Sequence, residues 1–409
     1  MTYRFLLLGL LAWVATASAH AEDWRGFLGS SNAFAPEANV PSEFTVSAEG
    51  KPAKNIAWRV PLAGRAVSGP IVVEDRVFAT SSSGIEQRWC EVACVHAETG
   101  QLLWSRKIKT TGRPYAHPTS ANAAPTPCSD GQHVFAFFSS NDLVCYDLDG
   151  NLKWYRGLGY DHPKAGNDVG MSSSPVVASG VVVVQSESQG DSFATGIDVK
   201  TGATLWQIER PHKANWSSPC VARGGDGQEV VLLQSSEDLI AVDPRSGSDV
   251  WKLDLKCSSI PSAVATDAKF YVPAGGLKAY ELPRGLEAPK LLWESSAANP
   301  ANASAVVTDT AILSIKGSVL AAVGLDGKTL WQARLGEIGQ VWSSPVVDAT
   351  KLVVFGMNGK CVVVDLSQGE GKVIATSSLG EEVLGSPAVA NNAIFVRSVS
   401  GLWKIAATE

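Results

Sequence analysis

The sequence predicts an all-β protein, an eight-bladed β-propeller built from four-stranded antiparallel blades. A motif that ends one strand, makes a tight turn and begins the next recurs along the chain; its best copies are AVDPRSGSDVW at residues 241–251 and GIDVKTGATLW at residues 196–206. The tryptophan that ends the motif returns at spacings of 46, 50, 52, 45, 42 and 38 residues from Trp58 to Trp331. Three short strands and a tryptophan strand per roughly 45 residues are typical of a propeller blade, and no helical period of useful length competes.

Each residue type in the motif has a structural task. The aspartate accepts backbone N–H groups of the turn, and the glycine adopts a positive φ. The tryptophan is expected to wedge between neighbouring blades, burying ~150–250 Å² each time. We assign these structural roles to Asp147, Asp198, Asp243 and Asp365, and to Trp58, Trp104, Trp154, Trp206, Trp251, Trp293 and Trp331. The eighth copy is degraded, because Val373 and Ile374 stand where the tryptophan would be.

Residues 1–21 are predicted to be a secretory signal peptide. Arg4 precedes an apolar run from Phe5 to Ala15, and the small residues at Ala19 and Ala21 suit cleavage. The run is too short to span a bilayer. The first cysteine, Cys90, is far from the cleavage site, so no lipid-accepting cysteine is expected there. We therefore expect a periplasmic or secreted protein without a transmembrane segment in the mature chain.

Residues 22–54 form a lead-in segment and residues 55–409 the propeller. The lead-in lacks clear alternation, but its large aromatic residues make it apolar enough to pack on the body: Trp24, Phe27, Phe34 and Phe44. The last repeat, from Leu384 to Ile405, supplies inner strands without an outer tryptophan strand, whereas Trp58 arrives before any inner strand. The Trp58 strand is therefore predicted to complete the C-terminal blade, which removes open sheet edges.

Composition and charge agree with a large closed ring. The 409 residues are 45% apolar and 18% charged, and 38 glycines with 21 prolines suit many turns. A closed repeat folds as one unit, so the length does not imply several domains. The net charge of −6, without a basic run, argues against binding to nucleic acid or to anionic membrane surfaces. We expect a monomer.

The seven cysteines are expected to act as small buried hydrophobic residues, since most stand among apolar strand residues. Their odd number leaves at least one free thiol or an intermolecular bond. If Cys90 and Cys94 lie in one strand, they are roughly 13 Å apart and cannot bridge. The sequence has no Cys-x-x-Cys and no adjacent cysteines, so zinc and dithiol redox chemistry have no support.

The motif Ala-x-Asp-x-x-[Thr/Ser]-Gly-x-x-x-Trp resembles the repeats of the pyrroloquinoline quinone (PQQ)-type β-propeller superfamily. The opening Trp24-Arg25-Gly26 resembles the lead-in of many exported bacterial members. The resemblance covers about Asn55 to Ile405 and implies the fold. For function it implies three branches: quinoprotein dehydrogenases, the cofactor-free propeller of the outer-membrane protein assembly machinery, and exported propellers of unknown role.

The sequence resembles the assembly-factor propeller more than the dehydrogenases. Quinoprotein dehydrogenases hold PQQ and calcium on the propeller axis, with an aspartate base and a vicinal disulfide. This chain has no adjacent cysteines, no cytochrome Cys-x-x-Cys-His motif and none of the long insertions of those enzymes. It departs from the assembly-factor branch in lacking the lipidated cysteine.

Candidate binding residues stand in the links between consecutive blades, where loops open onto the axis of a rigid frame. Three links each contain a histidine, and aromatic and polar residues accompany them: Arg113, Tyr115 and His117; His162, Asn167 and Asp168; His212 and Trp216. Trp342 precedes a Ser-Ser-Pro sequence just as Trp216 does. Together these residues are predicted to line a pocket at the channel mouth. Metal spacing is absent, so no metal site is expected; solvated histidines and tryptophans packed between blades are the open alternative.

We therefore expect an exported, non-catalytic propeller that binds a protein or another cell-envelope component through its loop face, without a cofactor. The first alternative is a PQQ-dependent quinoprotein oxidoreductase, for which Trp216 and Trp342 would be the aromatic platform. Calcium takes six to eight oxygen ligands, whereas only Asp161, Asn167 and Asp168, all in one link, offer them. The second alternative is a carbohydrate-binding or carbohydrate-processing propeller.

Overall fold

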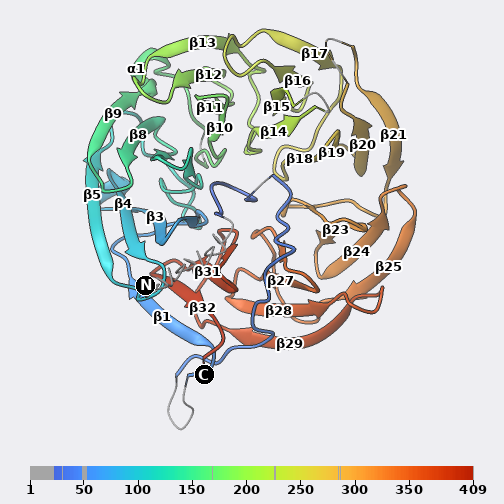
Figure 1. The fold of residues 1–409 in the computed structure, drawn as a ribbon. Helices are drawn as coiled ribbons and strands as arrows, with labels where there is room; N and C mark the ends of the chain where they lie inside the picture. Colours follow the sequence, from blue (N-terminus) through green and yellow to red (C-terminus); the bar gives the residue numbers. More distant parts are fainter. Residues whose placement is uncertain are drawn as a thin grey trace, which may run out of the picture.

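The computed structural model describes residues 23–29, 31–47, 53–167, 169–224, 227–283, 285 and 287–408; the predicted signal peptide lies outside them. Eight four-stranded antiparallel sheets stand around a common axis (Figure 1). The predicted all-β, eight-bladed fold is thus confirmed. Within the described ranges the single α-helix is α1, Leu158–Asp161, and no helix has the length and apolar character that crossing a membrane requires.

The blades are numbered here from the one that contains Trp58, and in each the strands run from the axis outward (Figure 1). Blade 1 is β30 (Ala388–Ala390), β31 (Ala393–Arg397), β32 (Gly401–Ile405) and β1 (Ile56–Pro61). Blade 2 is β2 (Ile71–Val73), β3 (Arg76–Ser83), β4 (Trp89–His96) and β5 (Leu102–Lys109), with the 3-10 turn η1 (Ile85–Gln87) between β3 and β4. Blade 3 is β6 (Cys128–Ser129), β7 (His133–Phe137), β8 (Asp142–Asp147) and β9 (Leu152–Gly157). Blade 4 is β10 (Val176–Ala178), β11 (Val181–Ser186), β12 (Phe193–Asp198) and β13 (Thr204–Glu209).

The other four blades repeat this order. Blade 5 is β14 (Cys220–Arg223), β15 (Glu229–Gln234), β16 (Leu239–Val242) and β17 (Asp249–Leu253). Blade 6 is β18 (Val264–Thr266), β19 (Lys269–Pro273), β20 (Leu277–Glu281) and β21 (Lys290–Ser295). Blade 7 is β22 (Val306–Val307), β23 (Ala311–Lys316), β24 (Val319–Gly324) and β25 (Thr329–Arg334). Blade 8 is β26 (Val346–Val347), β27 (Lys351–Phe355), β28 (Lys360–Asp365) and β29 (Lys372–Ser378).

The ring closes as predicted. The N-terminal strand β1 pairs antiparallel with the C-terminal strand β32, with Trp58 opposite Lys404 and Pro61 opposite Gly401. Blade 1 therefore takes its outer strand from the start of the chain and its three inner strands from the end. Because β1 pairs with β32, neither of these terminal strands is left without a neighbour in its sheet.

The motif tryptophans join neighbouring blades. The indole N–H of Trp206 in blade 4 donates to the carbonyl oxygen of Pro244 in blade 5 at 2.8 Å. Its ring covers Gly247, where a Cβ would lie 2.5 Å from the indole and φ is +70°, so glycine is needed on both counts. The same bond to the next blade is made by Trp104 to Leu148, Trp154 to Val199 and Trp293 to Leu325. The tryptophan and the glycine of the motif thus serve one contact between blades.

The motif aspartates hold the turns that receive these tryptophans. The Asp198 carboxylate accepts the Thr201 hydroxyl at 2.7 Å and the Thr201 N–H at 2.8 Å, and these bonds lower the pKa of Asp198. Asp243 accepts the corresponding groups of Ser246 at 2.9 and 2.8 Å. In blade 2, His96 takes the aspartate position and its Nδ1 accepts the Glu98 N–H at 3.1 Å.

All seven cysteines are buried, unpaired thiols. Burial raises the pKa of the Cys94 thiol to about 12, which keeps it protonated and unreactive at neutral pH. They behave as the small buried residues expected from their apolar neighbours.

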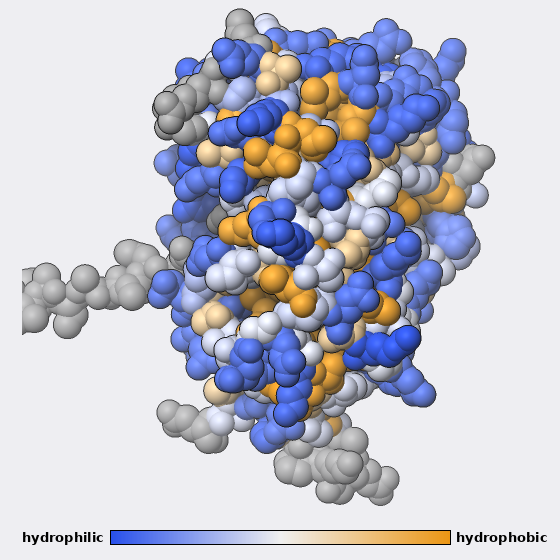
Figure 2. Space-filling view, turned by 90° about the vertical axis from the view of Figure 1, so that its right-hand side faces the viewer, coloured by the Kyte–Doolittle hydropathy of each residue, from blue (hydrophilic) through white to orange (hydrophobic). Residues whose placement is uncertain are grey.

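The rim of the ring carries apolar side chains among polar ones. Figure 2 faces the side of β21 and β25, where apolar patches are separated by hydrophilic residues. The large apolar side chains exposed on these two strands are those of Leu291, Leu292 and Leu330. Scattered apolar side chains of this kind are normal on protein surfaces, so the rim offers no continuous apolar face on this side.

Candidate functional site

Residues 23–29 and 31–47 of the lead-in cross one end of the propeller axis (Figure 1). Successive lead-in carbonyls accept N–H groups from the innermost strands of successive blades. Trp24 and Arg25 accept those of Val72 in blade 2 and Ser129 in blade 3, at 2.9 and 2.8 Å. Ser31, Asn32 and Ala33 accept those of Ala265, Val307 and Val347 in blades 6, 7 and 8, at 3.1, 3.1 and 3.0 Å. Each of these five lead-in residues thus binds one blade. Among the described residues, blades 4 and 5 receive no such bond.

The lead-in closes the axial channel over blades 4 and 5. Gly26 and Gly29 are joined by a backbone bond of 3.1 Å in a turn that carries Phe27 and Leu28. Leu28 is buried, and Trp24 is buried beside it in the same hydrophobic cluster. Phe27 borders both the cavity on the axis and a second cavity beneath the lead-in. Its ring therefore separates the two spaces.

A ring of hydroxyl groups surrounds the axis. The N–H of Ser174 in blade 4 donates to the Ser218 hydroxyl in blade 5 at 2.9 Å, and the Ser218 N–H donates to the Ser262 hydroxyl at 2.9 Å. The same bond runs from Gly69 to Thr126, Thr126 to Ser174, Ser262 to Ser304, Ser304 to Ser344, and Ser344 to Ser386. At the last junction Gly69 replaces the hydroxyl, because a Cβ there would lie 2.4 Å from the Ser386 carbonyl oxygen.

The hydroxyl ring lines a cavity of about 420 Å³ that is closed by Phe27. Trp216 and Trp342 stand among its lining residues together with His117, and Trp216 is fixed by an indole bond of 2.8 Å to the Gly170 carbonyl oxygen. None of the described lining residues is Asp, Glu, Lys or Arg. Among the described residues the seven ring hydroxyls accept bonds without donating one to the protein. The cavity thus presents fixed hydroxyl donors and two indoles without a formal charge.

The structure brings three of the predicted site residues together in this cavity: His117, Trp216 and Trp342. Arg113 and Tyr115 lie nearby in the same link as His117 but outside the cavity lining. Tyr115 is exposed, and the Arg113 guanidinium lies 5.1 Å from its ring centroid. The link also touches the next one, because the His117 N–H donates to the Val169 carbonyl oxygen at 3.1 Å.

The other described candidates, His162, His212 and Asn167, lie elsewhere, so the three histidines do not share one pocket. His162 stacks on Phe193 of blade 4 with ring centroids 3.8 Å apart, and its buried Nε2 has no hydrogen-bond partner among the described residues. His212 is exposed and pairs with Glu209 at 3.0 Å. Asn167 is buried and holds its own link through a 2.9 Å bond from the Val169 N–H. Asp168 lies outside the described residues.

Within the described ranges, no cluster of three or more His, Cys, Asp or Glu side chains has the geometry of a metal site. Three buried charges form a network between blades 4 and 5. Arg210 contacts Glu187 at 2.8 Å and Asp238 at 2.9 Å, and Asn215 donates to Glu187 at 3.0 Å. Burial raises the pKa of Glu187 to about 7, although Arg210 opposes the shift. These contacts satisfy a blade interface and lie outside the axial cavity lining.

Two parts of the cavity were not predicted from the sequence: Phe27, which closes it, and the ring of hydroxyl groups that lines it. Phe27 was noticed only as an apolar residue of the lead-in, and no periodic pattern links it to the axis. The ring had a visible signal, because Ser-Pro or Thr-Pro pairs precede several inner strands, as at Ser174, Ser218, Ser344 and Ser386. Such pairs are typical of turns before strands, and in this fold their hydroxyls also bind the preceding blade.

A family model described as "Outer membrane protein assembly factor BamB" matches residues 44–169, 91–264 and 315–409 of the chain. The outer membrane protein assembly factor BamB of Moranella endobia (strain PCIT) is 21% identical over 205 residues, which are 40% of this chain and 49% of that protein. The match thus spans about half the length of that relative.

Solved structures share the architecture at low identity. BamB from Moraxella catarrhalis superposes with a TM-score of 0.62 and 17% identity over 85% of this chain and 96% of that one. A europium-containing methanol dehydrogenase superposes with a TM-score of 0.66 and 13% identity over 93% of this chain and 90% of that one. At these identities the structural likeness speaks for the fold and leaves the choice between scaffold and enzyme to the site.

Proposed function

Because the chain belongs to the family described as outer membrane protein assembly factor BamB, we propose that it is a non-catalytic scaffold of the bacterial cell envelope. It binds a partner protein through the link face, where the axial cavity opens. The observation that carries this proposal is the uncharged cavity with Trp216 and Trp342 among its lining residues. Indole rings on a rigid frame supply contact area at low entropic cost. Catalysis of group transfer or oxidation usually combines several acids, bases or metal ligands, whereas the described lining holds one such side chain, His117.

The exposed aromatic residues around the cavity support a protein partner. Five exposed apolar residues lie on one sector of the link face, and we call them the loop patch: Ile85, Trp89, Tyr115, Tyr160 and Val169. Their loops touch one another, since the Thr110 N–H donates to the Arg88 carbonyl oxygen at 2.9 Å and Gly159 packs on Gly112. Cationic side chains lie over two of the rings, Lys107 over Trp89 and Arg113 over Tyr115. Aromatic residues with arginine are the residue types enriched in protein interfaces.

The donor set of the axial cavity does not suit PQQ with calcium. PQQ carries three carboxylates, which call for cationic partners, and calcium takes six to eight oxygens that usually include carboxylates. The described lining offers neither a cation nor a carboxylate, and His117 is its one titratable side chain. This mismatch supports a scaffold without that cofactor.

Carbohydrate binding is the second candidate, and one observation favours it. Seven hydroxyls that donate to no described protein group, together with two indoles, suit a neutral, hydroxyl-rich ligand. Such a ligand offers hydrogen-bond acceptors and apolar ring faces without charge. The cavity of about 420 Å³ lies within the range of small-molecule sites.

The test compares three proteins for chemical cross-linking to envelope proteins in living cells, followed by affinity measurement with the purified partner. The first carries Tyr115→Ala with Tyr160→Ala in the loop patch, the second carries Trp216→Ala, and the control carries Leu330→Ala on the rim. We expect a partner whose affinity falls about 10-fold or more for the first two proteins and stays unchanged for the control. Saturable, stoichiometric PQQ binding in the presence of calcium would instead establish the quinoprotein alternative. Partner binding that survives both sets of changes would refute the link-face proposal.

A further inference from the structure

At the lead-in end of the axis, blades 4 and 5 have main-chain donors that no described residue of the lead-in covers. Val177 of β10 and Val221 of β14 occupy the same place in their blades as Val72 and Val347, which donate to the lead-in. Among the described residues neither Val177 nor Val221 donates its N–H outside its own sheet. Both line a cavity of about 1010 Å³ beneath the lead-in. The eighth equivalent, Val389, is buried in the core cluster that contains Trp24.

Strand register directs both groups away from their own sheets. In an antiparallel ladder, pairs that exchange hydrogen bonds alternate with pairs that do not. Val177 stands opposite Val182, one pair before the two-residue turn, as Val72 stands opposite Val77. Because the Val72 N–H and carbonyl both bond to Trp24, this position faces outward from the sheet. The same alternation turns the N–H and carbonyl of Val177 towards the cavity.

The register gives the same result for Val221. Gly224 bonds to Gln228 at the turn of blade 5, and Val221 stands opposite Val231, three positions further along the ladder. Three steps of alternation place Val221 in a pair that does not exchange bonds. Blades 4 and 5 therefore present two adjacent, open inner edges.

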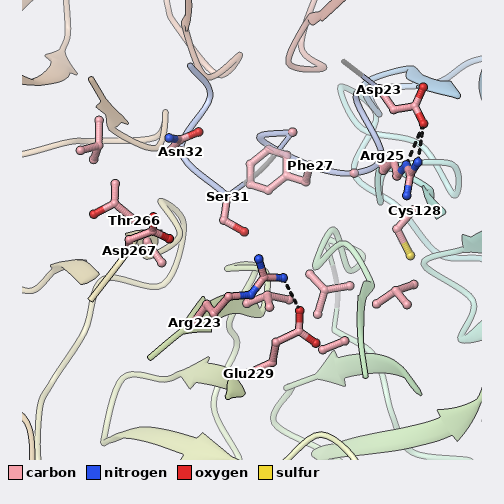
Figure 3. A pocket seen from close by; sticks show the side chains of 18 of the residues that line it. Asp23, Arg25, Phe27, Ser31, Asn32, Cys128, Arg223, Glu229, Thr266 and Asp267 are labelled. Atoms are coloured by element: carbon pink, nitrogen blue, oxygen red, sulfur yellow. Dashed lines mark hydrogen bonds and ion pairs between the residues drawn. The ribbon is translucent and has the colours of Figure 1, made fainter. Parts of the chain in front are cut away.

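The described lead-in residues supply no acceptor to these edges because residues 26–29 turn aside. Elsewhere one residue serves one blade, so two residues would bridge blades 4 and 5; the chain has five between Arg25 and Ser31. The extra length forms the turn that carries Phe27 to the axial cavity. Figure 3 shows the resulting space between Phe27 and Ser31 on one side and the Arg223–Glu229 pair on the other. The space thus lies between the inner edges of blades 4 and 5 and the turn that carries Phe27.

The charges around the space favour a basic occupant. Its lining has five carboxylates and three cationic side chains. Two of the cations are already paired, Arg25 with Asp23 and Arg223 with Glu229, each at 2.7 Å. Asp267 and Asp309 form no ion pair within the described residues, and even with Arg223 and Lys269 counted the lining holds two more carboxylates than cations. An incoming lysine or arginine therefore meets uncompensated negative charge, whereas an acidic side chain is repelled.

We propose that blades 4 and 5 bind an extended, lysine- or arginine-containing segment of a partner protein at this space. Two consecutive residues of the segment accept the Val177 and Val221 N–H groups, as lead-in residues do on the neighbouring blades. A basic side chain of the segment lies towards Asp267. Strand addition of this kind draws affinity from main-chain bonds and specificity from side-chain pockets. The site lies across Phe27 from the axial cavity and does not rest on the link-face proposal.

The test measures fluorescence anisotropy with a labelled, capped peptide, Thr-Val-Lys-Val-Thr, and the matching peptide with glutamate in place of lysine. We expect saturable binding of the lysine peptide and binding at least about 3-fold weaker for the glutamate peptide. Val177→Pro and Val221→Pro each remove one N–H at an outward-facing position that proline tolerates. Each change is expected to weaken lysine-peptide binding roughly 3- to 10-fold, the effect of one net hydrogen bond.

Val177→Thr and Val221→Thr are the matched controls, because they keep the N–H and a β-branched side chain. Thermal unfolding of all four variants must agree, which shows that any loss of binding is local. Absence of saturable lysine-peptide binding up to about 1 mM, or equal binding by the proline and threonine variants, would overturn the proposal. Self-association that the proline variants abolish would identify a second copy of this chain as the occupant, and would also overturn it.

Discussion

The indole N–H of Trp58 donates to the carbonyl oxygen of Ala97 at 3.1 Å. Trp58 lies in the N-terminal strand and Ala97 in the first complete blade, so this bond spans the junction at which the ring closes. The strand that completes blade 1 is therefore held by β32 on one side and by blade 2 on the other.

Trp58→Ala should destabilise the ring by about 3 kcal/mol, because it removes a large packed side chain and a bond between blades. Trp89→Ala is the control, since Trp89 is exposed on the link face, and should cost less than about 1 kcal/mol. Urea unfolding followed by far-UV circular dichroism measures both. Equal unfolding midpoints for the two variants would contradict the closure.

Replacing Trp206 by phenylalanine should lower the free energy of unfolding more than the same replacement of Trp251. Trp206 donates to Pro244, whereas Trp251 makes no such bond among the described residues and stacks on Phe270 with centroids 5.4 Å apart. Each change should cost ~1–3 kcal/mol, with Trp206→Phe about 1 kcal/mol worse because it also loses a hydrogen bond. Neither should alter partner affinity at temperatures where the protein is folded. A selective loss of affinity at unchanged stability would show that these tryptophans contact a ligand.

Adjacent serines in blade 4 provide a matched pair for the hydroxyl ring. The Ser174 hydroxyl accepts the Thr126 N–H at 3.0 Å, whereas the buried Ser173 hydroxyl has no partner among the described residues. Ser174→Ala leaves a buried N–H unsatisfied and should cost about 1–3 kcal/mol. Ser173→Ala should be neutral or stabilising, because it removes an unsatisfied polar group. Denaturant unfolding decides, and an equal loss in both variants would exclude a special role for the ring.

Glu187 should make stability fall as pH rises from about 4.5 to about 7. Burial raises its pKa in the folded protein to about 7, above its ordinary value of 4.5, so in this window the folded state binds more protons than the unfolded state. The slope is at most about 1.4 kcal/mol per pH unit and vanishes above the folded pKa. Glu187→Gln should remove this contribution. Unfolding free energies at pH 5, 6, 7 and 8 give the two slopes, and parallel slopes for wild type and variant would be the contrary result.

Amide hydrogen exchange should distinguish the open inner edges from the covered ones. Val72 donates to Trp24 at 2.9 Å, while Val177 holds the equivalent register without an acceptor among the described lead-in residues. We expect the Val177 and Val221 amides to exchange at least about 10-fold faster than the Val72 and Val347 amides. Mass spectrometry of short overlapping peptides resolves these positions. Equal protection at all four would mean that blades 4 and 5 are covered in solution.

The fold was predictable because its determinants are local and repeated. An aspartate, a glycine and a tryptophan at fixed offsets, as at Asp198, Gly202 and Trp206, define both the turn and the contact with a neighbouring blade. The last repeat lacks an outer tryptophan strand and the Trp58 strand lacks inner strands, so the sequence also predicted that these two parts form one blade. These signals recur often enough to identify a ring from one sequence.

The site was only partly predictable because its members meet through the ring, without a pattern along the chain. Trp216 and Trp342 both line the cavity, and each precedes the same Ser-Ser-Pro sequence. His162 and His212 share the link position of His117, yet a stacking partner and a neighbouring glutamate hold them elsewhere. Phe27 reaches the axis through a turn in an irregular segment, which no periodicity reveals.

The path of the lead-in has a consequence for the order of folding. The bond from Val347 to Ala33 joins residues that are 314 positions apart, whereas Trp24 finds Val72 within 48 positions. Contacts of such long sequence separation carry a large loop-closure cost and form late. Ser31, Asn32 and Ala33 are synthesised before every blade, but their carbonyl oxygens receive N–H groups from blades 6, 7 and 8 only after those blades have been made. A segment that is synthesised before the propeller is thus among the last to reach its native position.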